Sequence, residues 1–142
     1  MKNIHTMEKN QKKIKNSINK MKKQGCIQEA IEFCRHELSL NPNNYEIHVN
    51  LGDLYLEKHL DLSQAKMYID EAIDEYQLAL ESNLNNYQIL YKLALAFYYK
   101  DDFEKSLHYF NKVLEQKPKY AKAYLMISKI YLKKSNFHEA LD

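Results

Sequence analysis

The sequence predicts an all-α protein built from antiparallel helix pairs, and three observations support this fold class. Apolar residues recur at the helical period, since Leu90, Leu93, Ala94 and Phe97 fall at i, i+3, i+4 and i+7. The 142 residues include only two Gly and two Pro, so few residues interrupt a helix. The pattern of one segment returns at a spacing of 34 residues, which indicates a repeat array rather than an ordinary helical bundle.

The segment 87–120 shows the repeat unit most completely. It contains two amphipathic stretches that are joined at Asp101-Asp102, and Pro118 closes the second stretch. Two short helices with a tight turn between them form an antiparallel hairpin. A single hairpin of this size cannot bury both of its apolar faces, so the segment predicts similar neighbours on either side.

The neighbouring segments carry related patterns. Thirty-four residues later, the residues that overlie Leu90, Leu93, Ala94 and Phe97 are Tyr124, Ile127, Ser128 and Tyr131. The segment that starts at Tyr45 aligns with the first helix of the unit without a gap. Earlier in the chain, Gly25, Ala30 and Cys34 correspond to Asp101, Ser106 and Phe110. The repeat therefore extends over nearly the whole chain from about Gln11.

Three sets of residues resemble the motif of a known family. They are Leu51-Gly52-x-x-Tyr55, then Ala72-x-x-x-Tyr76-x-x-Ala79, then Pro42 and Pro118. Together with the 34-residue spacing they resemble the tetratricopeptide repeat, or TPR. The resemblance implies a right-handed α-solenoid, the TPR superhelix, in which the first helices of successive repeats line a concave groove. In this family the groove usually receives a peptide.

The first 44 residues divide into an N-terminal extension, 1–10, and a first repeat, 11–44. Gly25 is expected to end the first helix, and the second is expected from Ile27 to Leu40. Residues 1–23 carry eight Lys and one acidic residue, so this helix could lie on an anionic membrane or a nucleic acid. We expect instead that its apolar side packs on 27–40. Nucleic-acid binding is disfavoured because no aromatic residues interleave with these lysines.

Repeat two, 45–86, contains an insertion of about eight residues. Its expected small and aromatic residues, Ala72, Tyr76 and Ala79, occur eight positions later than the family spacing requires. The intervening residues keep the apolar period and contain no helix breaker, so they are expected to extend the second helix to roughly 20 residues, or ~30 Å. Asp61 or Ser63 is expected to cap this helix.

Repeat three, 87–120, is regular, and repeat four, 121–142, is expected to be truncated after its first helix. The turn after that helix is placed at Ser135-Asn136-Phe137. The sequence then stops in the opening turn of a second helix, where an array usually carries a polar capping helix. Three explanations remain open: a boundary of the expressed segment, a truncated gene product, or an open end that docks on another chain.

Composition and cysteine usage narrow the class of protein. With 45% hydrophobic and 28% charged residues, the composition is that of an ordinary globular protein. We expect no membrane span, because no apolar run is long enough, and no secretory signal, because the N-terminal lysines precede no apolar stretch. Cys26 and Cys34 are expected to be reduced thiols. These features predict a cytoplasmic protein.

The sequence contains no catalytic, cofactor-binding or metal-binding pattern. Its six His are scattered at about one per helix, without the spacing of metal ligands. Gly25 and Gly52 are the two glycines, so there is no glycine-rich phosphate loop. We therefore predict no enzyme activity and no cofactor. A protein-binding scaffold or adaptor is the expected function.

The resemblance implies that a peptide binds to the first helix of each repeat. The expected groove residues are Lys15, Asn19, Asn50, Asp53, Tyr91, Lys92, Leu95, Tyr98, Tyr99, Lys122, Met126 and Lys129. Along the repeats this groove is basic, then mixed acidic, then aromatic, then basic and apolar, so the expected partner is a protein or peptide with acidic ends and an apolar centre. Tyr98 and Tyr99 are candidate anchors, although packing within the chain remains an alternative for both.

Two more specific functions remain open. Chaperone-binding TPR domains grip a C-terminal carboxylate with a clamp of five polar residues. Four of these positions are matched here, by Lys15, Asn19, Asn50 and Lys92, whereas Gln88 replaces a basic residue. The resemblance therefore implies an acidic chaperone tail as one candidate ligand. The other possibility is self-assembly through the open C-terminal end of the array.

Overall fold

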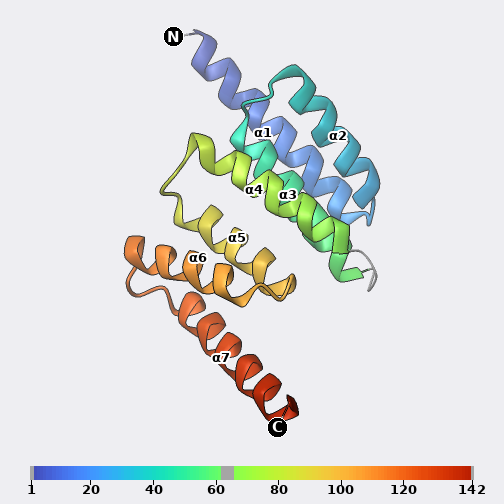
Figure 1. The fold of residues 1–142 in the computed structure, drawn as a ribbon. Coiled ribbons are helices and arrows are strands. Elements are labelled where there is room, and N and C mark those ends of the chain that lie inside the picture. The colour runs from blue at the N-terminus through green and yellow to red at the C-terminus, as the bar shows by residue number, and fades with distance from the viewer. Residues whose placement is uncertain (1, 62–65, 142) are drawn as a thin grey trace.

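The computed structural model describes residues 2–61 and 66–141, and these residues form seven α-helices (Figure 1). The helices are α1 Lys2–Lys23, α2 Ile27–Leu40, α3 Tyr45–Asp61, α4 Lys66–Ser82, α5 Tyr87–Tyr99, α6 Phe103–Gln116 and α7 Ala121–Leu141. None of the helices in the described part of the chain is long and apolar enough to cross a membrane.

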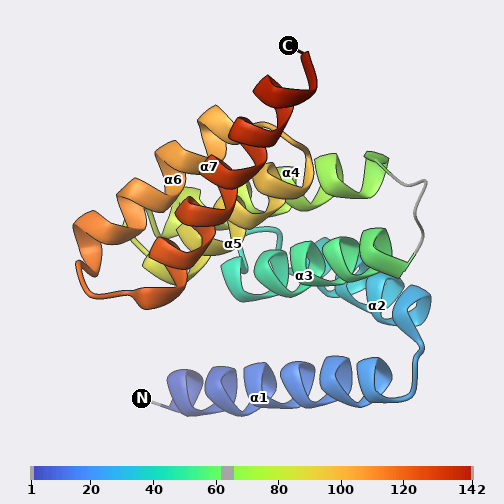
Figure 2. The ribbon, with the colours of Figure 1, turned by 90° about the horizontal axis from the view of Figure 1, so that it is seen from below.

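The helices follow one another through space in the order of the sequence, and the two termini lie at opposite ends (Figure 1). Each helix packs chiefly on the helix before it and the helix after it. Figure 2 shows α1 along one edge of this array. Packing between sequence neighbours is characteristic of a solenoid, whereas a bundle closes around a single shared core. The predicted all-α solenoid of antiparallel helix pairs is confirmed.

The tight turns after α1 and α5 have the same backbone geometry. Gly25 has a φ of 74° and Asp101 has a φ of 64°, so both lie in the left-handed region. In each turn the next amide donates to a carbonyl five residues earlier, Cys26 to Met21 at 2.9 Å and Asp102 to Phe97 at 3.0 Å. This arrangement is the Schellman motif, which satisfies the last carbonyls of a helix. The correspondence of Gly25 with Asp101 therefore extends to the backbone.

Side chains also fix the start of α5 and α6 and the approach of one helix to the other. Asn86 accepts hydrogen bonds from two backbone amides at the start of α5, at 3.0 and 3.2 Å. Asp102 accepts one at the start of α6, at 3.2 Å. The buried hydroxyl of Ser106 donates to the carbonyl of Ala94 at 2.8 Å, so α5 and α6 cross at two small residues.

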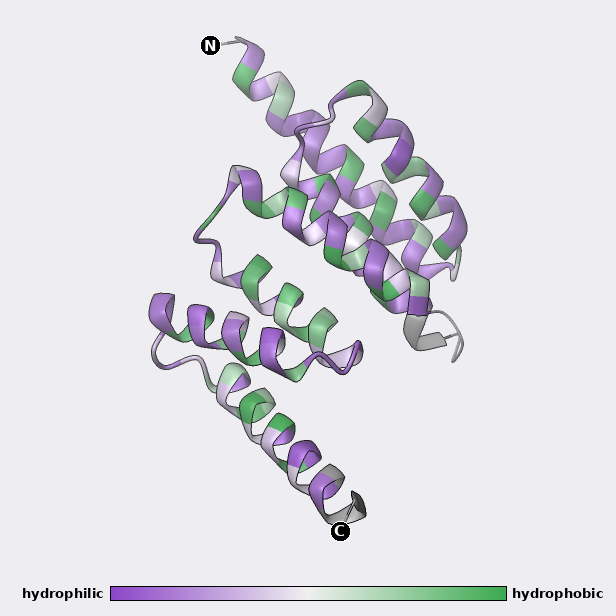
Figure 3. Ribbon diagram, in the orientation of Figure 1, coloured by the Kyte–Doolittle hydropathy of each residue, from purple (hydrophilic) through white to green (hydrophobic). Residues whose placement is uncertain are grey.

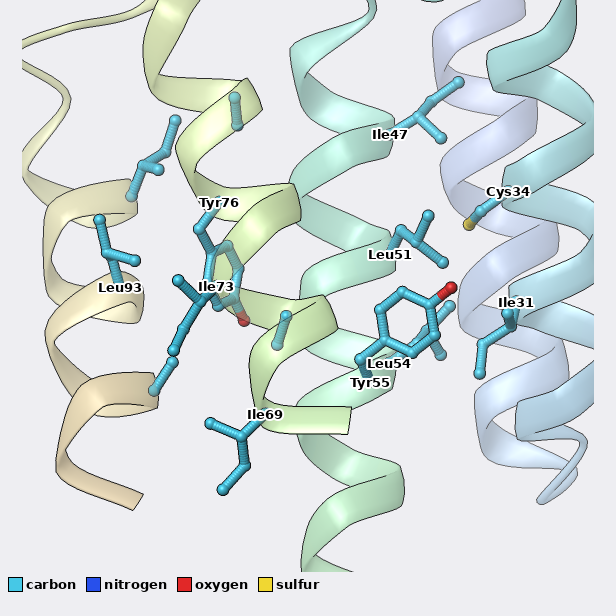
Figure 4. Packing of buried hydrophobic residues seen from close by; sticks show 14 of the residues in the cluster. Ile31, Cys34, Ile47, Leu51, Leu54, Tyr55, Ile69, Ile73, Tyr76 and Leu93 are labelled. Atoms are coloured by element: carbon cyan, nitrogen blue, oxygen red, sulfur yellow. The ribbon is translucent and has the colours of Figure 1, made fainter. Parts of the chain in front are cut away.

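Buried side chains form two clusters that meet at α5. The first cluster extends from α1 to α5 and includes Ile31, Leu54 and Ile69 (Figure 4). The second cluster lies on α5, α6 and α7 and consists of Leu90, Ala94, Phe110, Val113, Ala123, Met126 and Ile130. Figure 3 shows that α5 is mostly hydrophobic and that α1, at the edge, is mostly hydrophilic. This distribution follows from position, because α5 is covered on two sides.

At Gly52, helix α3 comes close to the aromatic ring of Tyr76 from α4. A Cβ atom added to Gly52 would lie 2.6 Å from Cε1 of that ring, so a larger residue would force the ring to move. Tyr76 is fully buried in the first cluster (Figure 4). The glycine and the aromatic residue of the motif thus form a packed pair, which explains in physical terms why they occur together.

The extra residues of repeat two lengthen both of its helices, whereas the sequence predicted an extension of the second helix alone. Helices α3 and α4 each contain 17 residues, compared with 13 in α5 and 14 in α6. Asp61 is the last residue of α3, so the prediction that it caps α4 is wrong. Good helix formers such as Leu56, Glu57 and Lys58 continue α3 past its expected end. Ser63, the other predicted cap, lies outside the described residues.

The turn predicted at residues 135–137 is not formed. Helix α7 continues from Ala121 to Leu141, and the hydroxyl of Ser135 donates to the carbonyl of Leu132 within this helix, at 2.8 Å. Continuing the helix keeps its backbone hydrogen bonds, whereas the α5 turn depends on the left-handed Asp101. Residues 2–10, predicted as an extension, are part of α1. The repeat boundaries themselves stay predictions.

Candidate functional site

Three alternate helices, α1, α3 and α5, surround one pocket of about 230 Å³. Its lining residues are Lys15 from α1, Tyr45, Glu46, Val49 and Asn50 from α3, Asn86 just before α5, and Gln88, Ile89 and Lys92 from α5. These helices are the first members of successive pairs, the ones expected to line a groove. The pocket brings together three residues predicted from the sequence, Lys15, Asn50 and Lys92.

The pocket wall combines charges of both signs with neutral amides. Lys15 and Glu46 are oppositely charged, and Asn50 is half-buried. The amide groups of Asn50 and Gln88 can each donate and accept hydrogen bonds, as a peptide backbone can. Val49 and Ile89 add apolar surface. The wall is therefore suited to polar recognition of a chain that presents both donors and acceptors.

Next to the pocket, Asp53 of α3 binds Lys92 of α5. The ammonium of Lys92 lies 2.7 and 2.6 Å from the two carboxylate oxygens of Asp53. The hydroxyl of Tyr76, from α4, donates to the Asp53 carboxylate at 2.6 Å. Burial, and after it the negative charge of Asp53, raises the pKa of Tyr76, so this hydroxyl stays protonated as a donor. Side chains from three helices thus share one polar network.

Asn19 does not join this pocket. It is exposed on α1 and lies with Asn16, Lys20, Lys23 and Gln24 along a separate hollow of that helix. Of the four residues that matched the clamp, three are therefore brought together and one is not. Gln88, the residue that replaces a clamp cation, lines the pocket with those three.

Three of the expected groove residues pack inside the molecule instead. Tyr91 is half-buried, and the centroid of its ring lies 5.5 Å from that of Phe110 and 5.4 Å from that of Tyr120, in edge contacts. Leu95 packs against the second cluster, and Met126 belongs to it with 7% of its surface exposed. The reason is that residues of α5, α6 and α7 share the second cluster, to which α7 contributes Met126.

The two candidate tyrosine anchors are only partly available to a ligand. Tyr98 is half-buried and contacts the rings of Tyr99 and Phe103, with centroids 5.5 and 6.1 Å away. The Lys133 ammonium lies 4.4 Å from the centroid of the Tyr98 ring, a cation–π distance. Tyr99 is 37% exposed. The remaining predicted residues, Lys122 and Lys129, are exposed on α7.

Tyr45, Asn86 and Ile89 line the pocket although the family pattern does not assign their positions to the groove. Tyr45 lies at the start of α3, and Asn86 and Ile89 lie around the start of α5. The sequence could have indicated Asn86, because an Asn directly before a helical pattern is a typical N-cap. Such a residue lies at the end of its helix, which is where this pocket is found. Tyr45 and Ile89 carried no such signal, since their residue types are equally common in cores.

The described residues contain no group of three or more His, Cys, Asp or Glu side chains that could hold a metal ion. Cys26 and Cys34 are free thiols. Burial, followed by the charges of Glu75 and Glu37, raises the pKa of Cys34 to about 12. A hydrogen bond with Glu29 raises the pKa of Cys26. Raised pKa values keep a thiol protonated and weakly nucleophilic.

Several solved structures have a similar fold. The first TPR of Spaghetti (RPAP3), bound to the HSP90 peptide SRMEEVD, is 21% identical with a TM-score of 0.74, over 86% of this chain and 90% of that chain. The second TPR domain of human RPAP3, in complex with the HSP70 peptide SGPTIEEVD, is 19% identical with a TM-score of 0.71, over 83% and 92%. A tetratricopeptide repeat protein from Parabacteroides merdae is 21% identical with a TM-score of 0.74, over 89% and 48%.

At these identities the structural likeness shows the fold, and the sequence of the chain shows the family. Residues 61–121 and 91–142 match the family model described as Tetratricopeptide repeat. The two matches together cover more than half of the chain and include α4 to α7. The Gly52–Tyr76 pair and the Schellman turns supply the corresponding packing and backbone features. The chain belongs to the tetratricopeptide repeat family.

Proposed function

We propose that this chain is a non-covalent interaction module that binds a peptide or partner surface at the pocket between α1, α3 and α5. The observation that carries the proposal is the convergence of Lys15, Asn50 and Lys92, from three separate helices, on one pocket. Membership of the family supports protein binding as the class of function. Two of the similar structures contain bound peptides, which supports a peptide as the ligand.

In this proposal the pocket recognises both the backbone and the side chains of the ligand. The amides of Asn50 and Gln88 exchange hydrogen bonds with an extended backbone, and Lys15 pairs with an acidic side chain. Val49 and Ile89 exclude water from these contacts. Because the three helices of the wall are already held in place by packing on α2 and α4, little further ordering is needed on binding.

Random peptides displayed on phage and selected against the whole chain test this function before any partner is identified. We expect the selected peptides to lose about tenfold or more in affinity for a Lys15→Ala/Asn50→Ala chain, because each change removes a polar contact. The matched control is Lys119→Ala/Asn111→Ala, which removes the same residue types from exposed positions outside the pocket.

Fluorescence anisotropy with synthetic copies of the selected peptides gives the affinities, and circular dichroism checks that each variant is helical. Equal affinity for the Lys15→Ala/Asn50→Ala chain and its control would show that binding lies elsewhere on the molecule. A selection that yields no binding peptide would contradict peptide recognition itself.

A second candidate function is self-association through α7. The side chains of Tyr124, Leu125, Tyr131 and Leu132 are 51%, 57%, 59% and 64% exposed. Their spacing places them on one side of the helix, and large exposed apolar surfaces of this kind typically contact another protein. The positions 34 residues before Tyr124 and Tyr131 are Leu90 and Phe97, which are both buried. Light scattering over a range of protein concentrations tests this function.

A further inference from the structure

The cation that α5 contributes to the pocket is already paired within the molecule. Lys92 donates to both oxygens of the Asp53 carboxylate, a bidentate contact at 2.6 and 2.7 Å. Charge-assisted hydrogen bonds of this length are among the stronger polar contacts in proteins. A ligand carboxylate that approaches Lys92 would have to share the ammonium with Asp53 or displace it.

Displacement is opposed because Asp53 is held from more than one side. The hydroxyl of Tyr76 donates to the same carboxylate at 2.6 Å, and the Tyr76 ring is fully buried against Gly52. Three quarters of the Asp53 side chain is covered, since only 25% of it is exposed. The carboxylate is therefore fixed beside the pocket by α4 and α5 as well as by its own helix.

The other cation of the pocket, Lys15, lines the same wall as the acidic Glu46. The lining residues that carry charge are Lys15, Glu46 and Lys92, and Asp53 lies directly against Lys92. The charged groups that line the pocket or pair with its lining are thus two positive and two negative. A terminal carboxylate adds a negative charge to a site that is already balanced, whereas an internal stretch of peptide backbone adds none.

We propose that Asp53 is a specificity-determining residue, whose pairing with Lys92 excludes peptide C-terminal carboxylates and leaves the pocket to internal peptide segments. This inference rests on the proposed peptide binding at the same pocket. It identifies the ligand as a chain that crosses the pocket through its backbone amides. It also explains why the matched clamp residues would not bind a terminal carboxylate here, because the clamp cation Lys92 is paired with Asp53 of a neighbouring helix.

Fluorescence anisotropy with the peptide SRMEEVD tests the inference, using one form with a free C-terminal carboxylate and one with a C-terminal amide. The wild-type chain is expected to bind the two forms with affinities within about twofold of each other. Asp53→Asn keeps the size of the side chain and an oxygen that accepts from Tyr76, but it removes the charge. This variant is expected to prefer the free acid by about tenfold, the ordinary worth of one charge-assisted hydrogen bond.

Lys92→Met added to Asp53→Asn supplies the second arm. The preference for the free acid should disappear in this double variant, because the released ammonium is its cause. Asp53→Ser is measured alongside, so that the test survives if the Asn variant is poorly folded. A wild-type chain that already prefers the free acid tenfold overturns the inference, as does a charge-removing variant that shows no preference.

The peptides selected on phage separate this inference from the function on which it rests. If these peptides bind Lys15→Ala/Asn50→Ala more weakly but Asp53→Asn shows no preference for the free acid, the pocket binds peptides and Asp53 does not determine specificity. The absence of any selected peptide that depends on Lys15 and Asn50 removes both. If Asp53→Asn prefers the free-acid peptide and the added Lys92→Met abolishes that preference, the result supports both peptide binding at the pocket and the role of Asp53.

Discussion

Tyr76 performs two roles that the sequence reveals to different degrees. The family pattern pairs a small residue, at position 52, with an aromatic residue in the next helix, so their contact is predictable once the eight-residue insertion is allowed for. The hydrogen bond from Tyr76 to Asp53, at 2.6 Å, is not. It joins residues on two helices, and the helix phase at Tyr76 depends on the insertion between them. Local sequence patterns predict which side chains are buried, but which polar groups become hydrogen-bond partners can be seen only once the helices are packed in the structure.

Cys34 stands where the other two complete repeats have the larger rings of Tyr76 and Phe110, and it is fully buried. In a Cys26→Ser chain, Cys34 is the only thiol. We expect iodoacetamide at pH 8 to alkylate Cys34 in the folded chain at a rate about 1000-fold or more below the rate in the unfolded chain. The reason is that raising the pKa from 9.0 to about 12 lowers the thiolate fraction by about that factor, before steric protection is added. Mass spectrometry of timed samples measures both rates.

The reciprocal chain, Cys34→Ser with Cys26 retained, is the control, since Cys26 is only partly buried. Cys26 should be alkylated far faster than Cys34 in the folded state, although its own pKa is raised. Equal rates for the two folded chains would mean that Cys34 is reached without unfolding, contrary to its position in the core.

At the scale of the element, side-chain caps decide where α5 begins. We expect Asn86→Ala to lower the free energy of unfolding by about 1 kcal/mol, the usual cost of losing an N-cap. Asn86 accepts two amide hydrogen bonds at 3.0 and 3.2 Å, which alanine cannot replace. Urea denaturation followed by circular dichroism measures the difference.

Asn85→Ala is the matched control, because it changes the same residue type one position earlier at an exposed site. Its effect should stay within about 0.5 kcal/mol, as for most surface substitutions. If the two variants lose the same stability, the cap contributes nothing beyond the loss of an exposed amide.

The elements that the sequence predicted well are those with strong local signals at their ends. Gly25, Asn86 and Asp101-Asp102 mark a turn or cap, and α2, α5 and α6 begin and end as expected. The ends of α3 and α7 differ because helix-compatible residues continue past the repeat spacing there. Such ends depend on packing against neighbours rather than on local signals, so a spacing rule places them incorrectly.

At the scale of the whole molecule, the family spacing predicted which helices share the pocket. It groups Lys15, Asn50 and Lys92, which line this pocket together, because it fixes the phase of α1, α3 and α5; their role in binding stays a prediction. It failed for Tyr91 and Met126, which the pattern assigns to the groove and the structure packs against α6 and its neighbours. Which residues at the edge of a groove stay exposed depends on the angle at which the next helix pair packs. That packing angle is set by contacts between whole helices, so the pattern of one repeat does not determine it.

Self-association through α7 is also a property of the whole molecule. We expect the wild-type chain to show a mass by light scattering that rises with concentration above that of one chain. Leu125→Lys/Leu132→Lys should stay at the mass of one chain, because charges on these exposed residues oppose apolar contact. Met67→Lys, at an apolar residue of α4 that is 62% exposed, is the control and should behave as wild type. A wild-type chain that remains monomeric at all concentrations would contradict this function.

The meeting of the two buried clusters on α5 bears on how the chain acquires its structure. Contacts between sequence neighbours close only short loops, which costs little chain entropy and favours fast folding. Helix α5 gives Ile89 and Leu93 to one cluster and Leu90 and Ala94 to the other. Neither half can complete its core until this helix is in place. Formation of α5 therefore couples the folding of the two halves, and the same helix forms one wall of the pocket.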